Sequence, residues 1–315
     1  CGARHGCWIC TASGERDRSL EQMLESEKYA YMRDLNRLRN WLANARYRWD
    51  LRASFRRGRP DGSDVRRMGA GMFSPETCAF LLRACLSIDL REIRRAKALK
   101  EDLDQGGWGD SYLTALRLNG QPFDRRYARR MVEPQFRLID IPETLLAIDF
   151  YWSINGMNRP FEALRIFRDV AERDGEIAIP ELAPGDPKGR PAERTVDAPG
   201  LSVRAGLVDH AGEAVDPETF GPRPHGKVDV MPHEEAGRFE VDREAAMWLL
   251  DWDMDYLVDE HESGYKPYAA AAFYLRNGVV RTVKGQSSTL DAMARRGQWV
   301  SDNGGWRQDD FPDAA

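Results

Sequence analysis

Apolar residues recur at steps of three and four positions through much of the first 175 residues, which is the period of an amphipathic α-helix. The first such run follows Ser19, which fits a capping box with Gln22, and it predicts one long helix over about 20–51. Its apolar face is formed by Leu24, Tyr31, Leu35, Leu38, Leu42, Ala45 and Trp49. We therefore expect the chain to open with a helical region.

Start and stop signals place the helices that follow. Ser74 followed by Pro75 is typical of an N-cap and a first helical residue, so a new helix is expected to begin there. Further helices are expected near 90–104, 142–154 and 160–174, each bounded by a glycine or a proline. Together these patterns predict that the first 175 residues are almost wholly helical.

The pattern changes after residue 175. Residues 176–200 are rich in proline and glycine and predict a linker. Beyond them, "LSVRAGLV", "GKVDVM" and "RFEVD" predict short strands, and "REAAMWLLDWDMDYLVDEHE" predicts a helix with a solvated acidic face. The expected fold class is mainly α: a cysteine-bearing helical region over 1–175, the linker, and a small acidic α+β region over 201–315, whose role the sequence does not indicate.

Composition narrows the class of protein. The 315 residues are 42% hydrophobic and 31% charged, which is enough apolar material for a packed core. The sequence has neither a run of about 18 apolar residues nor the layout of a signal peptide. Its five cysteines are an odd number and are unevenly spaced, which favours a reducing compartment. We therefore expect a cytoplasmic protein with no membrane partner.

Charge is distributed unevenly along the chain. Residues 1–137 hold 27 Lys/Arg against 18 Asp/Glu, whereas residues 138–315 hold 19 against 33. The basic part has arginines interleaved with Tyr47, Trp49 and Phe55, around a breaker-rich loop at 59–63. Such a pattern suits contact with a nucleic-acid backbone, the alternative being a solvated helix face that runs into a basic loop. The candidate nucleic-acid-binding residues are Arg46, Arg48, Arg52, Arg56, Arg57, Arg59, Arg66 and Arg67.

Three of the five cysteines stand in the first ten residues, in the order C-x5-C-x2-C. Cys7 and Cys10 are spaced to ligate one metal or cluster, and Cys1 can reach the same centre through a short loop. The fourth ligand could be His5, a cysteine preceding Cys1, or an exogenous group. Structural zinc and an iron–sulfur cluster both fit this spacing, and unligated structural cysteines are the alternative.

The remaining cysteines and the first residue carry less information. Cys78 and Cys85 lie seven positions apart on one predicted helix face and are expected to act as small buried hydrophobes. The chain begins with cysteine rather than methionine, inside the cysteine motif, so we expect it to be a piece of a longer protein.

The segment Arg4–Leu24, "RHGCWICTASGERDRSLEQML", resembles a segment of DndC-like proteins. In that family it typically reads R-F-G-C-W-x-C-T, followed by a charged E-x-D-K/R-S-M/L-E-x-M stretch. In the family, a long helix follows, and after it an arginine-rich loop and a helix start of the form G-x-F/Y-S/T. The stretch "RRMGAGMFSPETCAFLLRACL" is similar to this feature, and the resemblance extends to about residue 104. His5 departs from the family pattern, which usually has an aromatic residue there.

DndC-like proteins belong to the phosphoadenosine phosphosulfate reductase superfamily and act in DNA phosphorothioate modification. The resemblance implies an iron–sulfur cluster, expected to be of the 4Fe-4S type, with Cys7 and Cys10 as ligands and Cys1 as the third. It also implies DNA, a cysteine desulfurase and other proteins of the modification system as partners. The S-G-G-K-D-S phosphate loop of the family's ATP site is not in these 315 residues, so we expect ATP to bind an upstream domain.

Two other functions remain open at this point. A related reductase could act on a small sulfonucleotide rather than on DNA. A zinc-stapled helical module could bind nucleic acid or a protein partner and catalyse nothing. The sequence assigns no catalytic residue in any of the three cases.

Overall fold

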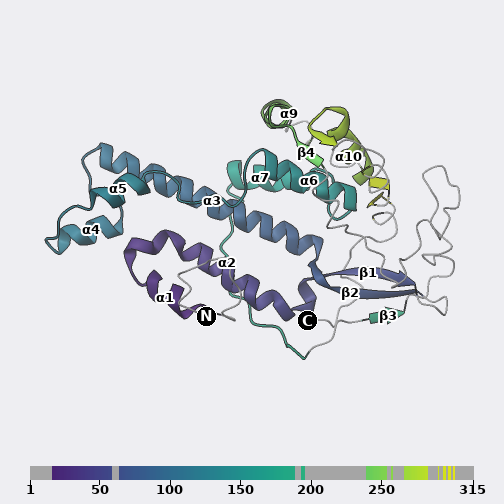
Figure 1. Cartoon of the computed structure of the whole chain (residues 1–315), viewed down its shortest axis with the longest axis horizontal. Coiled ribbons are helices and arrows are strands. Elements are labelled where there is room, and N and C mark those ends of the chain that lie inside the picture. The colour runs from purple at the N-terminus through teal and green to yellow at the C-terminus, as the bar shows by residue number, and fades with distance from the viewer. Residues whose placement is uncertain are drawn as a thin grey trace. The chain divides into compact units, whose positions relative to one another are not determined.

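The computed structural model describes residues 16–58, 64–188, 193–195, 239–253, 257 and 266–282, together with six residues between 290 and 301. As predicted, the protein is mainly helical. The chain forms two compact units. Figure 1 labels the helices and strands of both. The first consists of residues 1–48, 81–139 and 167–187, and the second of residues 49–80, 140–166 and 188–315. Residues 176–187, predicted to begin a linker, therefore belong to the first unit.

The first unit opens with short helices rather than the single helix predicted over 20–51. They are α1 (Arg18–Leu24), the 3-10 helix η2 (Glu27–Met32), α2 (Arg33–Asn44) and the 3-10 helix η3 (Ala45–Tyr47). The break falls at Ser26, whose backbone is extended at ψ 128°. Apolar periodicity predicts the buried side of a segment but is insensitive to one extended residue, which is why the break was not predicted.

The N-cap of α1 is Asp17, not the predicted Ser19. The Asp17 carboxylate accepts hydrogen bonds from the backbone N–H groups of Ser19 and Leu20, both at 3.1 Å. Leu20, at the third helical position, is almost completely buried. An acidic N-cap also interacts favourably with the positive end of the helix dipole.

Helix α3 (Pro75–Asp104) continues from the second unit into the first. Its start was predicted correctly, because Pro75 is the first helical residue and the Ser74 hydroxyl accepts from the Thr77 backbone N–H at 3.1 Å. The helix expected separately near 90–104 is the C-terminal part of this same helix.

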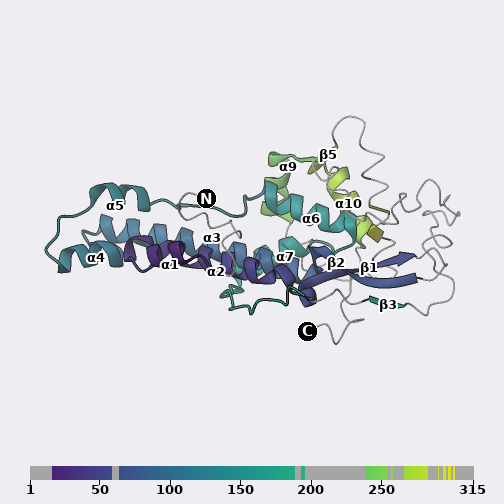
Figure 2. The ribbon, with the colours of Figure 1, turned by 60° about the horizontal axis from the view of Figure 1, so that its bottom comes forward.

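Two short helices of the first unit were not predicted, α4 (Ser111–Leu118) and α5 (Arg125–Met131). Both lie beside the C-terminal end of α3 in Figures 1 and 2. Each has an aspartate N-cap, Asp110 or Asp124. They form a buried cluster with α3 that consists of Leu99, Leu113, Tyr127, Ala128 and Met131.

The second unit contains a β-sheet where the sequence predicted helix and loop. The sequence predicted a basic helix running into a loop over residues 46–67. Most of this segment instead lies in two strands, β1 (Arg52–Gly58) and β2 (Asp64–Phe73), which follow the 3-10 turn η4 (Trp49–Leu51). A third strand, β3 (Glu193–Thr195), pairs with β2, so the antiparallel order is β1-β2-β3. Arginine has little intrinsic preference for strands, and cross-strand pairing leaves no periodic signal in so polar a segment.

The rest of the second unit packs around α6 (Glu143–Asn155), and α7 (Glu162–Glu172) begins here before continuing into the first unit. Both were predicted to within a few residues. The C-terminal elements are β4 (Phe239–Val241), α9 (Arg243–Trp248), the π-helical turn η5 (Leu249–Asp253), α10 (Pro267–Arg276) and β5 (Val280–Thr282). Phe150 of α6 makes edge-to-face ring contacts with Phe239 and Tyr274.

Two of the C-terminal predictions are confirmed in part. The run "RFEVD" contains β4, which pairs with β5, and the predicted acidic helix begins as α9 and η5. The runs "LSVRAGLV" and "GKVDVM" lie outside the described residues. Among the helices of the described ranges, none has both the length and the apolar character needed to cross a membrane.

Candidate nucleic-acid interface

The predicted cluster ligands Cys1, Cys7 and Cys10, with His5, lie outside the described residues, as does Arg59. Within the described ranges, no three His, Cys, Asp or Glu side chains gather as a metal site would require. The structure therefore bears on the predicted metal centre only through the helix that follows it, which starts at the Asp17 cap.

Cys78 and Cys85 are free and partly buried on α3. Burial raises the pKa of the Cys78 thiol to about 11 and that of the Cys85 thiol to about 12. Each is therefore a protonated thiol at neutral pH, which is a poor nucleophile and a poor metal ligand. This environment suits the packing role expected of both.

Five of the predicted arginines lie in the β1–β2 hairpin: Arg52, Arg56, Arg57, Arg66 and Arg67. Arg56 pairs with Arg66 across the two strands, whereas Arg57 pairs with Val65 and Phe55 pairs with Arg67. Residues directly opposite each other share one face of a sheet, and successive residues alternate between faces. Arg56 and Arg66 therefore occupy one face, and Arg57 and Arg67 occupy the other.

The Arg56–Arg66 pair places two like charges directly opposite each other. Like charges at directly opposed positions of antiparallel strands are in general unfavourable. The register therefore brings two of the predicted arginines to paired positions in the hairpin.

Arg46 and Arg48 belong to the first unit, near the C-terminal end of α2. Arg46 is exposed, with its guanidinium carbon 5.1 Å from the centre of the Tyr47 ring. Arg48 donates to the carbonyl of Ala183 at 3.3 Å. Arg46 is thus the more exposed of the two residues.

Arg52 does not fit the predicted role. Only 8% of this residue is exposed, and its guanidinium carbon lies 4.4 Å from the centre of the Phe73 ring. Burial also lowers the pKa of the Arg52 guanidinium. We interpret Arg52 as a packing residue at the base of the hairpin, where it pairs with Phe73 in register.

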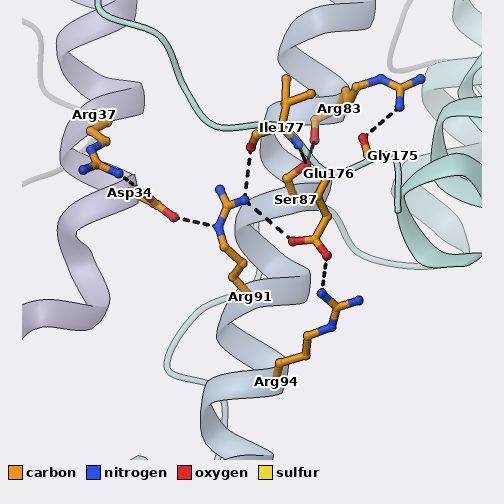
Figure 3. A network of polar contacts seen from close by, with 9 residues as sticks. All are labelled: Asp34, Arg37, Arg83, Ser87, Arg91, Arg94, Gly175, Glu176 and Ile177. Atoms are coloured by element: carbon orange, nitrogen blue, oxygen red, sulfur yellow. Dashed lines mark hydrogen bonds and ion pairs between the residues drawn. The ribbon is translucent and has the colours of Figure 1, made fainter. Parts of the chain in front are cut away.

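Arginines on α3 form a polar network that the sequence did not indicate (Figure 3). Arg83 donates to the carbonyl of Gly175 at 2.9 Å, and Arg91 donates to that of Ile177 at 3.0 Å. Arg91 also donates to Asp34 of α2 at 2.7 Å, and Arg94 pairs with Glu176. The network attaches residues 175–177 to α3.

Because these α3 guanidiniums are bound to carboxylates and backbone carbonyls, they are poor candidates for binding phosphate. The segment that follows residue 177 is also attached to α2, because the Asn44 side-chain amide donates to the carbonyl of Leu182 at 2.8 Å. No motif marks these contacts in the sequence, since each joins residues more than 50 positions apart.

No protein-family model, curated protein or solved structure matches this chain.

Proposed function

We propose that this chain is the C-terminal part of a DndC-like, iron–sulfur-containing sulfurtransferase that acts in the cytoplasm and helps to install sulfur in the DNA backbone. The observation that carries the proposal is the segment Arg4–Leu24. It combines the closely spaced cysteines with the charged stretch that follows them in that family.

In this proposal Cys7, Cys10 and Cys1 would hold the cluster, and the cluster-bearing part would receive or present sulfur delivered as a persulfide by a cysteine desulfurase. A thiol or dithiol reductant would supply the two electrons that bring this sulfur to the sulfide level. The sulfur would then bond to the adenylylated DNA phosphate while the activated non-bridging oxygen leaves with AMP. Adenylylation of the target by ATP belongs to a domain outside these 315 residues, which lack the S-G-G-K-D-S loop.

The start of α1 supports this interpretation of the segment. Asp17, which the resemblance includes, caps α1 seven residues after Cys10. Leu20, also included, is buried in the first unit. These shared positions have a defined folding role, which is to begin a helix directly after the cysteine motif.

The hairpin supports DNA as the substrate rather than a small sulfonucleotide. Arg56 and Arg66 lie opposite each other on an extended antiparallel sheet. Cationic residues at paired register positions suit the repeating charges of a nucleic-acid backbone.

The metal centre is the first test. The protein purified without oxygen should contain iron and acid-labile sulfide, because the resemblance to DndC-like proteins implies an iron–sulfur cluster at these thiolates. Replacing Cys7 or Cys10 by serine should remove most of both, measured by colorimetric iron and sulfide analysis.

Cys78→Ser is the matched control, since this partly buried thiol lies on α3 and should affect only packing. Stoichiometric zinc without sulfide in the wild-type protein would contradict the cluster. That result would favour the alternative of a zinc-stapled module that binds DNA through the hairpin and catalyses nothing.

A further inference from the structure

Helix α5, in the first unit, presents a basic face. Four of its seven residues are exposed arginines, which we call the α5 arginine face: Arg125, Arg126, Arg129 and Arg130. At about 100° of rotation per residue, they fall within an arc of about 140°. The buried residues Tyr127, Ala128 and Met131 occupy the opposite side of the helix. One side thus anchors α5 in the core, and the other exposes its cations.

The α5 arginine face has no counter-charge within the described part of the chain. The arginines of α3 pair with carboxylates, whereas none of the four on α5 forms an ion pair with a described residue. Arg125 and Arg129 are four positions apart, as are Arg126 and Arg130, and like charges at that spacing destabilise a helix. A local cost that nothing in the described ranges offsets is typical of a binding surface.

The end of α4 exposes an apolar side chain close to α5 in the chain. Leu118, the last residue of α4, is 81% exposed, more than any other large hydrophobic residue of the described ranges. The guanidinium carbon of its neighbour Arg117 lies 5.5 Å from the centre of the Trp108 ring. Trp108 in turn makes an edge-to-face contact with Phe123, two residues before α5, at 5.4 Å. These contacts connect the end of α4 with the start of α5.

Cations together with an exposed leucine favour a protein partner. A nucleic-acid backbone offers phosphates to arginine but no apolar surface to cover Leu118, whereas a protein can supply both carboxylates and an apolar contact. Arginine binds carboxylates through two parallel hydrogen bonds, and arginine and tryptophan are enriched at protein interfaces. Arginines four positions apart are separated by about 6 Å along the helix, which matches carboxylates at the same spacing on a second helix.

We propose that the α5 arginine face and Leu118 dock a protein partner that presents an acidic amphipathic helix. Carboxylates of that helix pair with the arginines, and its apolar residues cover Leu118. This inference is independent of the proposed function, and it assigns a partner-binding surface to two helices that carry none of the predicted site residues.

The test is isothermal titration calorimetry of the full chain with a synthetic peptide. The probe is a peptide of about 20 residues, long enough to form a helix, in which Glu and Leu recur at three- and four-residue steps. A peptide of the same composition in scrambled order is the control. The wild-type chain should bind the probe more tightly, because only the probe forms a helix with separate acidic and apolar faces.

Variants of the chain identify the surface. Arg125→Gln combined with Arg129→Gln should weaken binding of the probe roughly tenfold, as should Leu118→Ser alone. Lysine at both arginine positions keeps the charges and should restore most of the affinity. Arg18→Gln removes an exposed cation of α1 in the same unit and should leave the affinity unchanged. Circular dichroism checks that each variant is folded.

Each result decides for or against this surface. Equal affinity for the probe and the scrambled peptide would overturn the proposal, as would wild-type affinity in the double arginine variant. If only the arginine substitutions weaken binding and duplex DNA displaces the probe, the surface binds polyanions and the assignment to a protein partner is wrong. Iron and sulfide content does not enter this experiment, so it can fail while the proposed function stands, and the reverse.

Discussion

At the scale of single residues, the buried carboxyl group of Asp149 in α6 connects three helices of the second unit. It accepts hydrogen bonds from the Tyr274 hydroxyl of α10 and from the Ala163 backbone N–H of α7, both at 2.6 Å. Burial raises the pKa of Asp149 to about 6, although both hydrogen bonds oppose that shift. Because an unfolded aspartate has a pKa of about 3.9, the folded state binds this proton more tightly.

This pKa predicts a pH-dependent stability. The contribution of Asp149 should be fully present below about pH 4 and should be lost as the pH rises through 6, since folding then requires a buried charge. At about 1.4 kcal/mol per pKa unit, the loss between pH 4 and pH 7.5 is about 3 kcal/mol. Asp149→Asn cannot ionise, so urea unfolding should show the wild type losing about that much stability relative to the variant.

Tyr274→Phe serves as the control for this experiment. It removes a hydrogen bond that lowers the pKa of Asp149, so the stability loss should begin at the same low pH and continue to a higher pH than in the wild type. An identical pH dependence in the wild type and Asp149→Asn would show that Asp149 titrates normally.

At the scale of elements, the N-cap of α1 differs from the predicted one. Ser19 is exposed, whereas Asp17 accepts two backbone hydrogen bonds as the cap. Asp17→Ala should therefore lower the unfolding free energy by about 1 kcal/mol, the usual cost of losing an N-cap. Thermal unfolding followed by circular dichroism measures it.

Ser19→Ala should be neutral or slightly stabilising, since alanine is the better helix former at an exposed helical position. A larger loss in Ser19→Ala than in Asp17→Ala would restore serine as the cap. The comparison also tests whether the acidic position shared with the DndC-like segment has the folding role given to it here.

Which elements could be predicted depended on the kind of signal. Helices with a local start signal, such as Ser74-Pro75 of α3, were found, because capping is decided within a few residues. The aspartate caps of α4 and α5 are equally local, yet the helices that follow them are too short to show a clear period. The hairpin was missed because its strands are held by partners across the sheet rather than by neighbours in sequence.

At the scale of the whole molecule, charge along the sequence and charge in the fold are different quantities. Residues 138–315 are strongly acidic in composition, yet β3 delivers Arg194 from that half to the arginines of β1 and β2. The pairing of Arg194 with Arg66 joins residues 128 positions apart, so the sequence alone did not predict it. The sequence prediction also included Arg52, whose burial against Phe73 only the fold reveals.

The central claim is that this chain belongs to a protein that places sulfur in DNA, and mass spectrometry of nuclease-digested DNA tests it most directly. DNA from cells that express the complete protein and its partners should contain phosphorothioate-linked dinucleotides. DNA from matched cells with Cys10→Ser should lack them, while Cys78→Ser should leave them near the wild-type level. Phosphorothioates absent from the wild type, or equally abundant with Cys10→Ser, would contradict the claim.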